Sequence, residues 1–318
     1  MQNRQMKVLF AASPAIAVPS LEAICNIKCI ELAGVLTNPD TPRGRHGTPL
    51  PTDIGEAAAG RGIPVIKPLK LDLSAREQIG TLKCDLLVSF AYGRLFGPKF
   101  LALFPLGGIN IHPSLLPRYR GPTPIQAAIL NRDNVTGITI QTLAKEMDSG
   151  AVLAQEQLYM TGKETAGSLG EIAAVKAAAM LPDVLKRIAD GTAAGEEQNH
   201  SEAVYCSLIN KEDGFIDWNR SAAEIEAKIR GFTPWPLCRT IHNGRELIIL
   251  KADVFKGSAG EKASLNGQVL GTDKNDGILV QTGDGILAVT ELQYQAKKAL
   301  FWRDFLNGAR DFPGAQLT

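Results

Sequence analysis

The sequence predicts an α/β protein: a doubly wound, mostly parallel β-sheet followed by a small antiparallel β-barrel. Strand-like and helix-like segments alternate through residues 1–191, which is typical of parallel sheets with right-handed crossovers. The segment 192–204 is small, polar and without periodicity, as linkers are. After it, short β-like runs are separated by glycine-containing turns, which favours an antiparallel barrel.

The first domain supplies the alternating elements. We expect strands at 7–12, 30–37, 85–90, 108–112, 137–143 and 151–160, and helices at 19–26, 52–61, 74–82, 122–131 and 167–189. Ser74 is the expected N-cap of its helix, with Glu77 at the third helical position. The run 85–90 is almost continuously apolar, as in a strand buried on both faces. These elements predict a Rossmann-like domain over residues 1–191.

The second domain has a different texture. We expect one helix at 221–230 and β-like segments at 237–242, 246–255, 267–271, 277–282 and 286–294. Trp302 and Phe305 have helical spacing and are expected to cover the barrel, while Trp235, between two prolines, is expected to be packed rather than to stack on bases. We therefore predict a linker at 192–204 and an OB-like domain over 205–318.

Composition excludes several classes of protein. The chain has 318 residues, of which 45% are hydrophobic and 21% are charged, and this balance excludes wholesale disorder, collagen and coiled coil. No stretch approaches the ~20 apolar residues of a membrane span, and the apolar run near the start is too short for the core of a signal peptide. The cysteines and histidines are scattered, so we expect neither a disulfide framework nor a metal site. We predict a cytoplasmic protein that acts as a monomer.

Candidate chemistry lies away from the first strand–helix turn. The turn 11–17 contains no glycine, whereas a dinucleotide-binding turn needs glycines for close approach of the backbone to a pyrophosphate. Asn110 and His112 stand two apart on a probable central strand, so they share a face at its carboxyl end, where open α/β sheets bind ligands. Asp148 lies in the tight loop 144–150 between two expected strands.

These residue types suit the attack of an amine on a carbonyl. Asn110 can donate to an oxygen that becomes negative in a tetrahedral intermediate. His112 can donate to the same oxygen or carry a proton to the leaving group. Asp148 can orient the imidazole, favour its protonated form, or accept the proton of the amine through water. No serine or cysteine nucleophile is paired with this histidine in the sequence, so we expect direct transfer without a covalent intermediate.

The run Asn110-Ile111-His112-Pro113-Ser114-Leu115-Leu116-Pro117, with Asp148 and Gly150 further on, resembles the signature of the folate-dependent formyltransferases. That family takes a formyl group from 10-formyltetrahydrofolate. The resemblance implies that Asn110, His112 and Asp148 form the catalytic trio, and it implies no metal. The residues that it assigns to folate binding are Ser114, Leu115, Leu116 and Pro117 in one loop, and Ser89, Phe90, Ala91 and Tyr92 at a strand end that lines the pterin pocket through backbone groups.

The formyl acceptor is indicated by a second resemblance. The segment 229–236 is similar to the opening of the carboxyl-terminal domain in those family members that formylate initiator methionyl-tRNA, and 39–45 is similar to their first loop, which contacts the acceptor arm. The resemblance implies initiator methionyl-tRNA as the partner, for translation initiation. Two alternatives within the family are an amino sugar on a nucleotide as acceptor, or water, which would make the protein a 10-formyltetrahydrofolate hydrolase. From another class, a tRNA-binding module without catalysis is the alternative.

Charge is balanced over the chain but not along it. The 34 lysines and arginines against 33 acids leave a net charge of +1, yet the segments 41–52, 86–132 and 227–245 contain basic residues and no acids. Such segments provide what phosphate contacts need. The residues we expect to contact tRNA are Arg43, Arg45, His46, Arg118, Arg120, Lys228, Arg239, Lys297 and Lys298.

Overall fold

The computed structural model describes residues 4–43, 47–257 and 265–318. The chain forms two compact units, each discontinuous in sequence: Met1–Pro124, Val135–Tyr159 and Gly170–Ser207 make unit 1, and Ile125–Asn134, Met160–Leu169 and Leu208–Thr318 make unit 2. The domain limits expected from the sequence stay a prediction. Within the described ranges, no helix combines the length and the apolar character needed to cross a bilayer.

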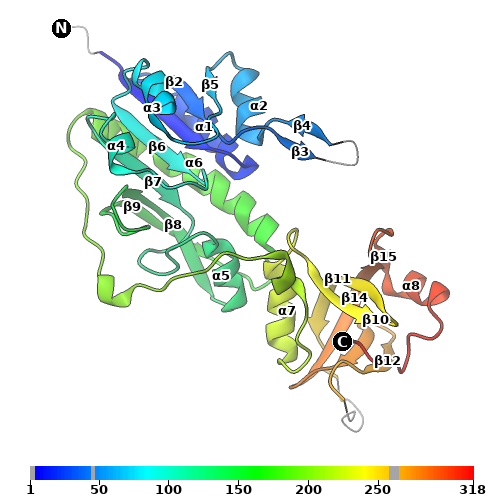
Figure 1. Ribbon diagram of the computed structural model, residues 1–318. Coiled ribbons are helices and arrows are strands. Elements are labelled where there is room, and N and C mark those ends of the chain that lie inside the picture. Colours follow the sequence, from blue (N-terminus) through cyan, green and yellow to red (C-terminus); the bar gives the residue numbers. More distant parts are fainter. Residues whose placement is uncertain (1–3, 44–46, 258–264) are drawn as a thin grey trace. The chain divides into compact units, whose positions relative to one another are not determined.

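The described part of unit 1 is built on a seven-stranded sheet with the order β5-β2-β1-β6-β7-β8-β9 (Figure 1). Neighbouring strands are parallel from β5 to β7, and β8 and β9 are antiparallel. Its strands are β1 (Met6–Ala12), β2 (Ile30–Leu36), β5 (Val65–Ile66), β6 (Leu86–Phe90), β7 (Gly108–His112), β8 (Val135–Thr142) and β9 (Val152–Tyr159). Its helices are α1 (Val18–Cys25), α2 (Asp53–Ala59), α3 (Leu73–Gly80), α4 (Pro98–Leu101) and most of α6 (Ala166–Ala189).

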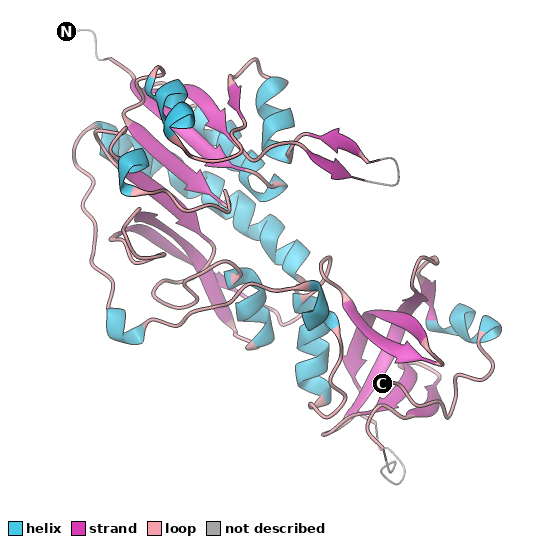
Figure 2. Ribbon diagram, in the orientation of Figure 1, coloured by secondary structure: helices cyan, strands magenta, loops and turns pink. Residues whose placement is uncertain are grey.

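Both faces of the central strand β1 are covered. Leu9 and Ala11 pack in one core cluster with Ile79 of α3 and Phe100 of α4. Phe10 points to the opposite face, because successive side chains of a strand alternate, and it is also fully buried. Helices therefore cover the sheet on both sides (Figure 2), and the prediction of a doubly wound, mostly parallel sheet is confirmed.

Three local details of unit 1 differ from the predictions. Helix α3 begins at Leu73, and its N-cap is Asp72, whose carboxylate accepts from the amide of Ala75 at 3.1 Å. Ser74 is therefore inside the first turn, because an aspartate two residues earlier satisfies the free amide. The segment expected to be the first loop contains a hairpin of β3 (Thr41–Arg43) and β4 (Thr48–Leu50), and α4 was not predicted.

Unit 2 contains an antiparallel sheet with the order β10-β11-β14-β13-β12, and β15 pairs with β14. Its strands are β10 (Cys238–His242), β11 (Arg245–Val254), β12 (Val269–Asp273), β13 (Gly277–Gln281), β14 (Ile286–Tyr294) and β15 (Leu300–Phe301). Its helices are α5 (Pro124–Leu130), α7 (Ala222–Gly231) and α8 (Trp302–Gly308). The predicted antiparallel β domain is confirmed.

The tryptophans of unit 2 differ from one another. Trp302 and Phe305 of α8 are buried in the core of the sheet, as expected from their spacing. Trp235 is 55% exposed, so the expectation that it is packed was wrong. The two flanking prolines did not indicate burial, because a proline fixes the backbone and says nothing about what covers the neighbouring side chain.

Candidate active site

Strand β7 carries the first two predicted catalytic residues. It lies between β6 and β8, so that Asn110 is opposite Ser89 on one side and Gln141 on the other, while His112 is opposite Thr139. The strand is buried at Gly108 and Ile109 and at its carboxyl end, and His112 is only 4% exposed. The side chains of Asn110 and His112 therefore lie on one face of the sheet, at the carboxyl end of β7.

The imidazole of His112 has one nitrogen already engaged. Nε2 lies 2.8 Å from the carbonyl oxygen of Tyr119, and a carbonyl can only accept, so Nε2 carries a proton. Nδ1 lies 3.7 Å from Oδ1 of Asp148. Nδ1 is therefore the nitrogen that can gain or lose a proton during a reaction.

Asp148 lies in the loop between β8 and β9, with a left-handed backbone (φ 52°) that aspartate tolerates better than most residues. The loop is held tightly against the end of β8. A Cβ on Gly150 would overlap the carbonyl oxygen of Thr142, so only glycine fits there. The close packing of Gly150 against Thr142 fixes the position of the loop, and so of Asp148, relative to the end of β8.

The carboxylate of Asp148 is held by donors on both oxygens. Oδ2 accepts from the backbone amide of Gly121 at 2.8 Å. Oδ1 accepts from Nε2 of Gln141 at 3.0 Å and from Nδ2 of Asn110 at 3.4 Å. The side chain is 12% exposed, and the contacts with Asn110 and His112 bring the whole predicted trio together.

Two glutamines of this site were missed by the sequence analysis. Gln141 is 1% exposed and Gln198 is 7% exposed, and they bond to each other at 3.0 Å. A polar residue on the strand next to β7 could have indicated Gln141. Nothing local indicated Gln198, because it lies in the polar segment interpreted as a linker, which pairs with β9 through Val152 and Glu196.

The loop after β7, predicted to bind folate, is fixed to the neighbouring strands. Ser114 is fully buried, and its hydroxyl donates to the carbonyl of Arg118 at 2.6 Å. Thr139 donates to the carbonyl of Ser114 at 2.7 Å and accepts from the amide of Leu116 at 3.2 Å. The side chain of Ser114 is thus used within the chain, and the surface of the loop is formed by Leu115 and Pro117.

At the carboxyl end of β6, the accessible groups are mainly backbone peptides, because most of the side chains are buried. Ser89, Phe90 and Tyr92 are buried, whereas Ala91 is exposed and has a left-handed backbone (φ 52°). Burial raises the pKa of the Tyr92 phenol above its ordinary value, and the charge of Arg94 offsets part of this effect. Any ligand here would therefore meet the peptide groups around Ala91.

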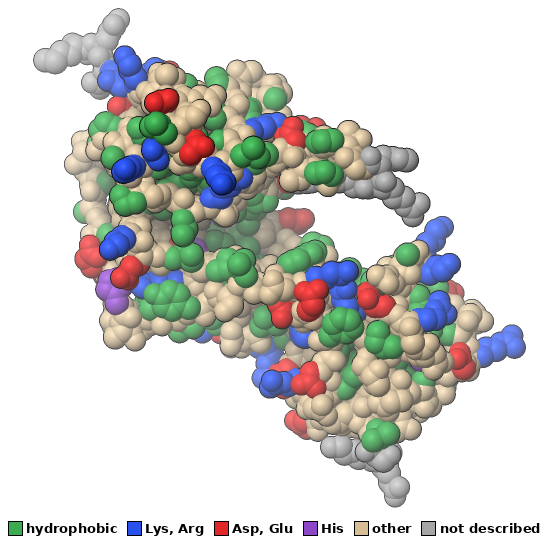
Figure 3. Space-filling model, in the orientation of Figure 1, with side chains coloured by type: hydrophobic (Ala, Val, Ile, Leu, Met, Phe, Trp, Pro, Cys, Tyr) green, Lys and Arg blue, Asp and Glu red, His purple; other side chains and the backbone are tan. Residues whose placement is uncertain are grey.

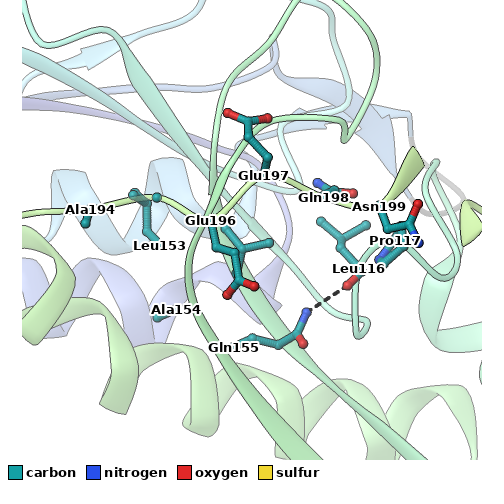
Figure 4. A pocket seen from close by; sticks show the side chains of 12 residues that line it. Leu116, Pro117, Leu153, Ala154, Gln155, Ala194, Glu196, Glu197, Gln198 and Asn199 are labelled. Atoms are coloured by element: carbon teal, nitrogen blue, oxygen red, sulfur yellow. Dashed lines mark hydrogen bonds between the residues drawn. The ribbon is translucent and has the colours of Figure 1, made fainter. Parts of the chain in front are cut away.

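A cavity of about 560 Å³ opens beside the loop of Leu116 and Pro117. Strand β9 and the segment 194–199 form its other walls, and Figure 4 shows the bond from Gln155 to the carbonyl of Leu116, at 3.0 Å, beside it. The cavity does not include the trio itself. It is connected to the trio by Gln198, which lines the cavity and donates to the carbonyl of Asp148 at 2.9 Å.

Two of the basic residues expected to contact tRNA are buried. Arg120 is 1% exposed and donates to Gln198 and Tyr205. Arg239 is 5% exposed and pairs with Glu246 at 3.2 Å. These two expectations were wrong, because an acid-free stretch of sequence does not tell which of its cations point inward.

The other basic residues differ in exposure. Lys228 is half-buried, its ammonium donates to the carbonyl of Phe215 at 2.6 Å, and burial lowers its pKa. Arg118, Lys297 and Lys298 are exposed. Arg45 and His46 lie outside the described residues, as does the side chain of Arg43. Cationic and acidic side chains are interspersed over the face seen in Figure 3. In the described ranges no cluster of histidine, cysteine and acidic residues could hold a metal ion.

The chain is similar to known proteins of one family. Residues 6–185 match the family model described as formyl transferase, and residues 208–310 match formyl transferase, C-terminal domain. A methionyl-tRNA formyltransferase of Treponema denticola is 49% identical over 317 residues, covering 96% of this chain and 98% of that protein. A methionyl-tRNA formyltransferase of Borrelia hermsii is 40% identical over 309 residues, covering 97% of this chain and 99% of that protein.

Solved structures share the fold at lower identity. An N-formyltransferase of Helicobacter canadensis, in complex with folinic acid and dTDP-3-aminofucose, aligns with a TM-score of 0.64 at 21% identity, covering 90% of this chain and 99% of that one. HypX of Aquifex aeolicus, in complex with tetrahydrofolic acid, aligns with a TM-score of 0.60 at 18% identity, covering 95% of this chain and 47% of that one. With both domain models matched and full-length relatives at 40–49% identity, the chain belongs to the methionyl-tRNA formyltransferase family.

Proposed function

We propose that the protein transfers the formyl group of 10-formyltetrahydrofolate directly to the α-amino group of initiator methionyl-tRNA, with Asn110, His112 and Asp148 as catalytic residues. The observation that supports these roles is that all three side chains meet at Oδ1 of Asp148. Nδ2 of Asn110 lies 3.4 Å from this oxygen, and Nδ1 of His112 lies 3.7 Å from it. The family of the chain supports the reaction.

The first step is attack by the neutral amine on the formyl carbon. A carbon–nitrogen bond forms, and the formyl oxygen becomes negative in a tetrahedral intermediate. Asn110 has an amide that can donate to this oxygen, and a positioned donor of this kind is worth roughly 10²–10³ in rate. The bond from Nδ2 to Asp148 is long, at 3.4 Å, so a hydrogen of this amide can turn to the substrate.

The second step breaks the carbon–N10 bond and needs two proton transfers, one from the new ammonium and one to N10. Asp148 accepts the proton of the new ammonium, directly or through a water. His112, when protonated on Nδ1, supplies a proton to N10 of the folate as the carbon–N10 bond breaks, which gives tetrahydrofolate and the N-formyl product. Asp148 and Nδ1 of His112 lie 3.7 Å apart, so one water or amine can contact both and return the proton to the imidazole.

Substrate binding is proposed at the loop and the strand end that the family resemblance indicates. Leu115, Leu116 and Pro117 would contact the folate, and the peptide groups near Ala91 would bind the pterin, because Ser89, Phe90 and Tyr92 are buried. Arg118, Lys297 and Lys298 are the exposed cations that we propose for tRNA phosphates, with Arg43, Arg45 and His46 kept as sequence-based candidates. Lys228 stays a candidate for contact with tRNA, although its side chain is only half-exposed.

The proposed setting is the cytoplasm, where aminoacylated tRNA is made and used. The proposed state is a monomer, in which one chain supplies Asn110, His112 and Asp148. The acceptor is assigned from the full-length relatives, which are named for methionyl-tRNA. The resemblance to the N-formyltransferase of Helicobacter canadensis, at 21% identity, shows the fold alone.

The test is a formylation assay with the full chain, 10-formyltetrahydrofolate and two acceptors, initiator and elongator methionyl-tRNA. We expect formyl-methionine on the initiator tRNA, and a drop of about 10³-fold or more in kcat for Asp148→Asn, since the amide cannot take up a proton. Absence of product with the initiator tRNA would reject the function. Product formation by Asp148→Asn at the wild-type rate would remove Asp148 from the catalytic residues.

A donor-only reaction separates the alternatives. Without tRNA, the proposed enzyme should consume 10-formyltetrahydrofolate far more slowly than with it. Equal consumption with and without tRNA would support a hydrolase instead. Folate-independent binding of tRNA with no turnover would support a binding module.

A further inference from the structure

Arg120 is a buried cation that forms no ion pair with an acidic side chain in the part of the chain that the structure describes. It is 1% exposed, and its partners among the described residues are neutral groups. Nε and Nη2 donate to Oε1 of Gln198 at 3.1 and 2.6 Å. Nη1 donates to the Tyr205 hydroxyl at 3.3 Å, and Nη2 lies 3.0 Å from Nδ1 of His200. A buried charge is costly unless hydrogen bonds satisfy it, so this guanidinium needs Gln198.

The guanidinium fixes which way the Gln198 amide points. An arginine side chain has donors only, so the oxygen of Gln198 must face Arg120 and the nitrogen must face away. Nε2 of Gln198 then donates toward Oε1 of Gln141 at 3.0 Å and toward the carbonyls of Asp148 and Gly150 at 2.9 and 2.7 Å. The orientation follows from the donors of the guanidinium and the acceptors on the far side of the amide.

The orientation of Gln198 in turn fixes the orientation of the Gln141 amide. Oε1 of Gln141 accepts from Gln198, so its Nε2 must point the other way, and it lies 3.0 Å from Oδ1 of Asp148. Both glutamine side chains are buried, so water does not compete strongly for these bonds. A directed chain of donors thus begins at Arg120 and ends at the carboxylate of the trio.

We propose that Arg120, Gln198 and Gln141 form a hydrogen-bond relay of fixed polarity that presents a donor to Asp148 and holds its carboxylate in position to accept a proton. A donor to the charged form of an acid favours that form. The proposal rests on the catalytic role of Asp148 proposed above. The three residues act through Asp148, so they are positioning residues.

The relay makes a prediction that simple packing does not. Gln198→Glu keeps the size of the side chain and its acceptors for Arg120, so the buried cation stays paired. The ionised carboxylate has no donor for Gln141, however, and the amide of Gln141 is then free to turn its oxygen toward Asp148. The new carboxylate also repels Asp148 directly, so Gln141→Leu, which removes the donor without adding a charge, separates the relay from charge repulsion.

The experiment measures kcat and KM for both substrates against pH in the formylation assay, with the full chain. For Gln198→Glu we expect kcat on the acidic limb of the pH profile to fall about ten- to a hundred-fold, the loss expected for one hydrogen bond to a charged group, and to approach the wild-type value at higher pH. The KM values should stay within about twofold, because the relay does not touch substrate. The pH below which kcat declines should rise by about one to two pH units.

Gln157→Glu is the matched control. Gln157 is exposed on β9 and contacts the Tyr159 hydroxyl, so the same added charge there should leave kcat and its pH profile unchanged. A folded Gln198→Glu variant with the kcat and pH profile of the wild type would overturn the relay.

Gln141→Leu keeps the proposal open to test if Gln198→Glu does not fold. It removes the relay's donor to Asp148 and should give the same pH shift; an unmoved pH profile would again overturn the relay. A failure of the proposed function looks different, because wild-type protein would then form no product, or Asp148→Asn would turn over normally.

Discussion

The imidazole of His112 has one free nitrogen, and this restricts what the histidine can do. Nε2 is bound to the carbonyl of Tyr119, so proton exchange must pass through Nδ1, next to Asp148. The sequence left open whether His112 donates to the oxyanion or to the leaving group. We propose that His112, with Nδ1 beside Asp148, protonates the leaving group and that Asn110 donates to the oxyanion.

Asn110→Ala tests this division of roles. We expect kcat to fall roughly 10²–10³-fold with little change in KM, because the donor acts on the charge that develops in the transition state. Steady-state formylation kinetics provide the measurement. Asn26→Ala, at an exposed asparagine after α1, should match the wild type. A large rise in KM with unchanged kcat would show instead that Asn110 binds the ground state.

The sequence predicted that Asn110 and His112 share the end of one strand, as the structure shows, but it did not predict the residues that hold Asp148. Asn110 and His112 could be picked out because they are two residues apart in an otherwise apolar strand, which places both side chains on the same face. Gln198 reaches Asp148 across 50 positions of sequence, and such a contact leaves no local pattern. Arg120 was predicted to be exposed for the same reason. Its charge is visible in the sequence, but its burial depends on Gln198 and Tyr205, which lie 78 and 85 positions later.

At the scale of elements, the loop between β8 and β9 is closed where Thr142 and Ala151 meet. The amide of Ala151 donates to the hydroxyl of Thr142 at 2.9 Å, and the amide of Thr142 donates to the carbonyl of Ala151, also at 2.9 Å. Gly150 lies between these contacts without room for a Cβ. The position of Asp148 therefore depends on a residue that has no chemistry of its own.

Gly150→Ala should displace this loop. The added carbon would overlap the carbonyl of Thr142, so we expect a loss of about 1–3 kcal/mol of stability and a reduction of kcat that exceeds the loss of folded protein. Gly97→Ala is the control, because nothing lies within 4 Å of its added Cβ. Thermal unfolding and formylation of both variants provide the test. A fully active Gly150→Ala variant would show that the loop does not need this fit.

Elements with strong periodicity were predicted well. Strand β7 has the bounds expected from the sequence, since a run bounded by glycine and proline has clear ends. The ends of α3 were shifted, because two candidate caps, Asp72 and Ser74, stand close together and only one can accept from the amide of Ala75. The hairpin of β3 and β4 was missed because its strands are short and exposed, without an apolar face to mark them.

For the molecule as a whole, the net charge of +1 hides the distribution that matters for a polyanion. Burial removes Arg120 and Arg239 from the surface. Arg118, Lys297 and Lys298 stay exposed. The number of cations available to phosphates is therefore smaller than the acid-free segments suggested.

Lys297→Ala and Lys298→Ala test this reduced set. Each should weaken tRNA binding, for initiator and elongator tRNA alike, and should reduce the slope of log K against log salt by about 1. Binding measured from about 50 to about 200 mM salt gives the slope. Lys186→Ala, at an exposed lysine of α6, should leave it unchanged. An unchanged slope in the first two variants would remove them from the interface.

The pairing of Val152 with Glu196 has a consequence for synthesis of the chain. Strand β9 is an edge of its sheet, and exposed edges are templates for aggregation. The segment that covers the start of this edge leaves the ribosome after the whole of α6. Until then the nascent sheet has an open edge, protected by the polar run Gln155, Glu156 and Gln157. Slow translation through α6 should therefore lengthen the time during which nascent chains can pair wrongly.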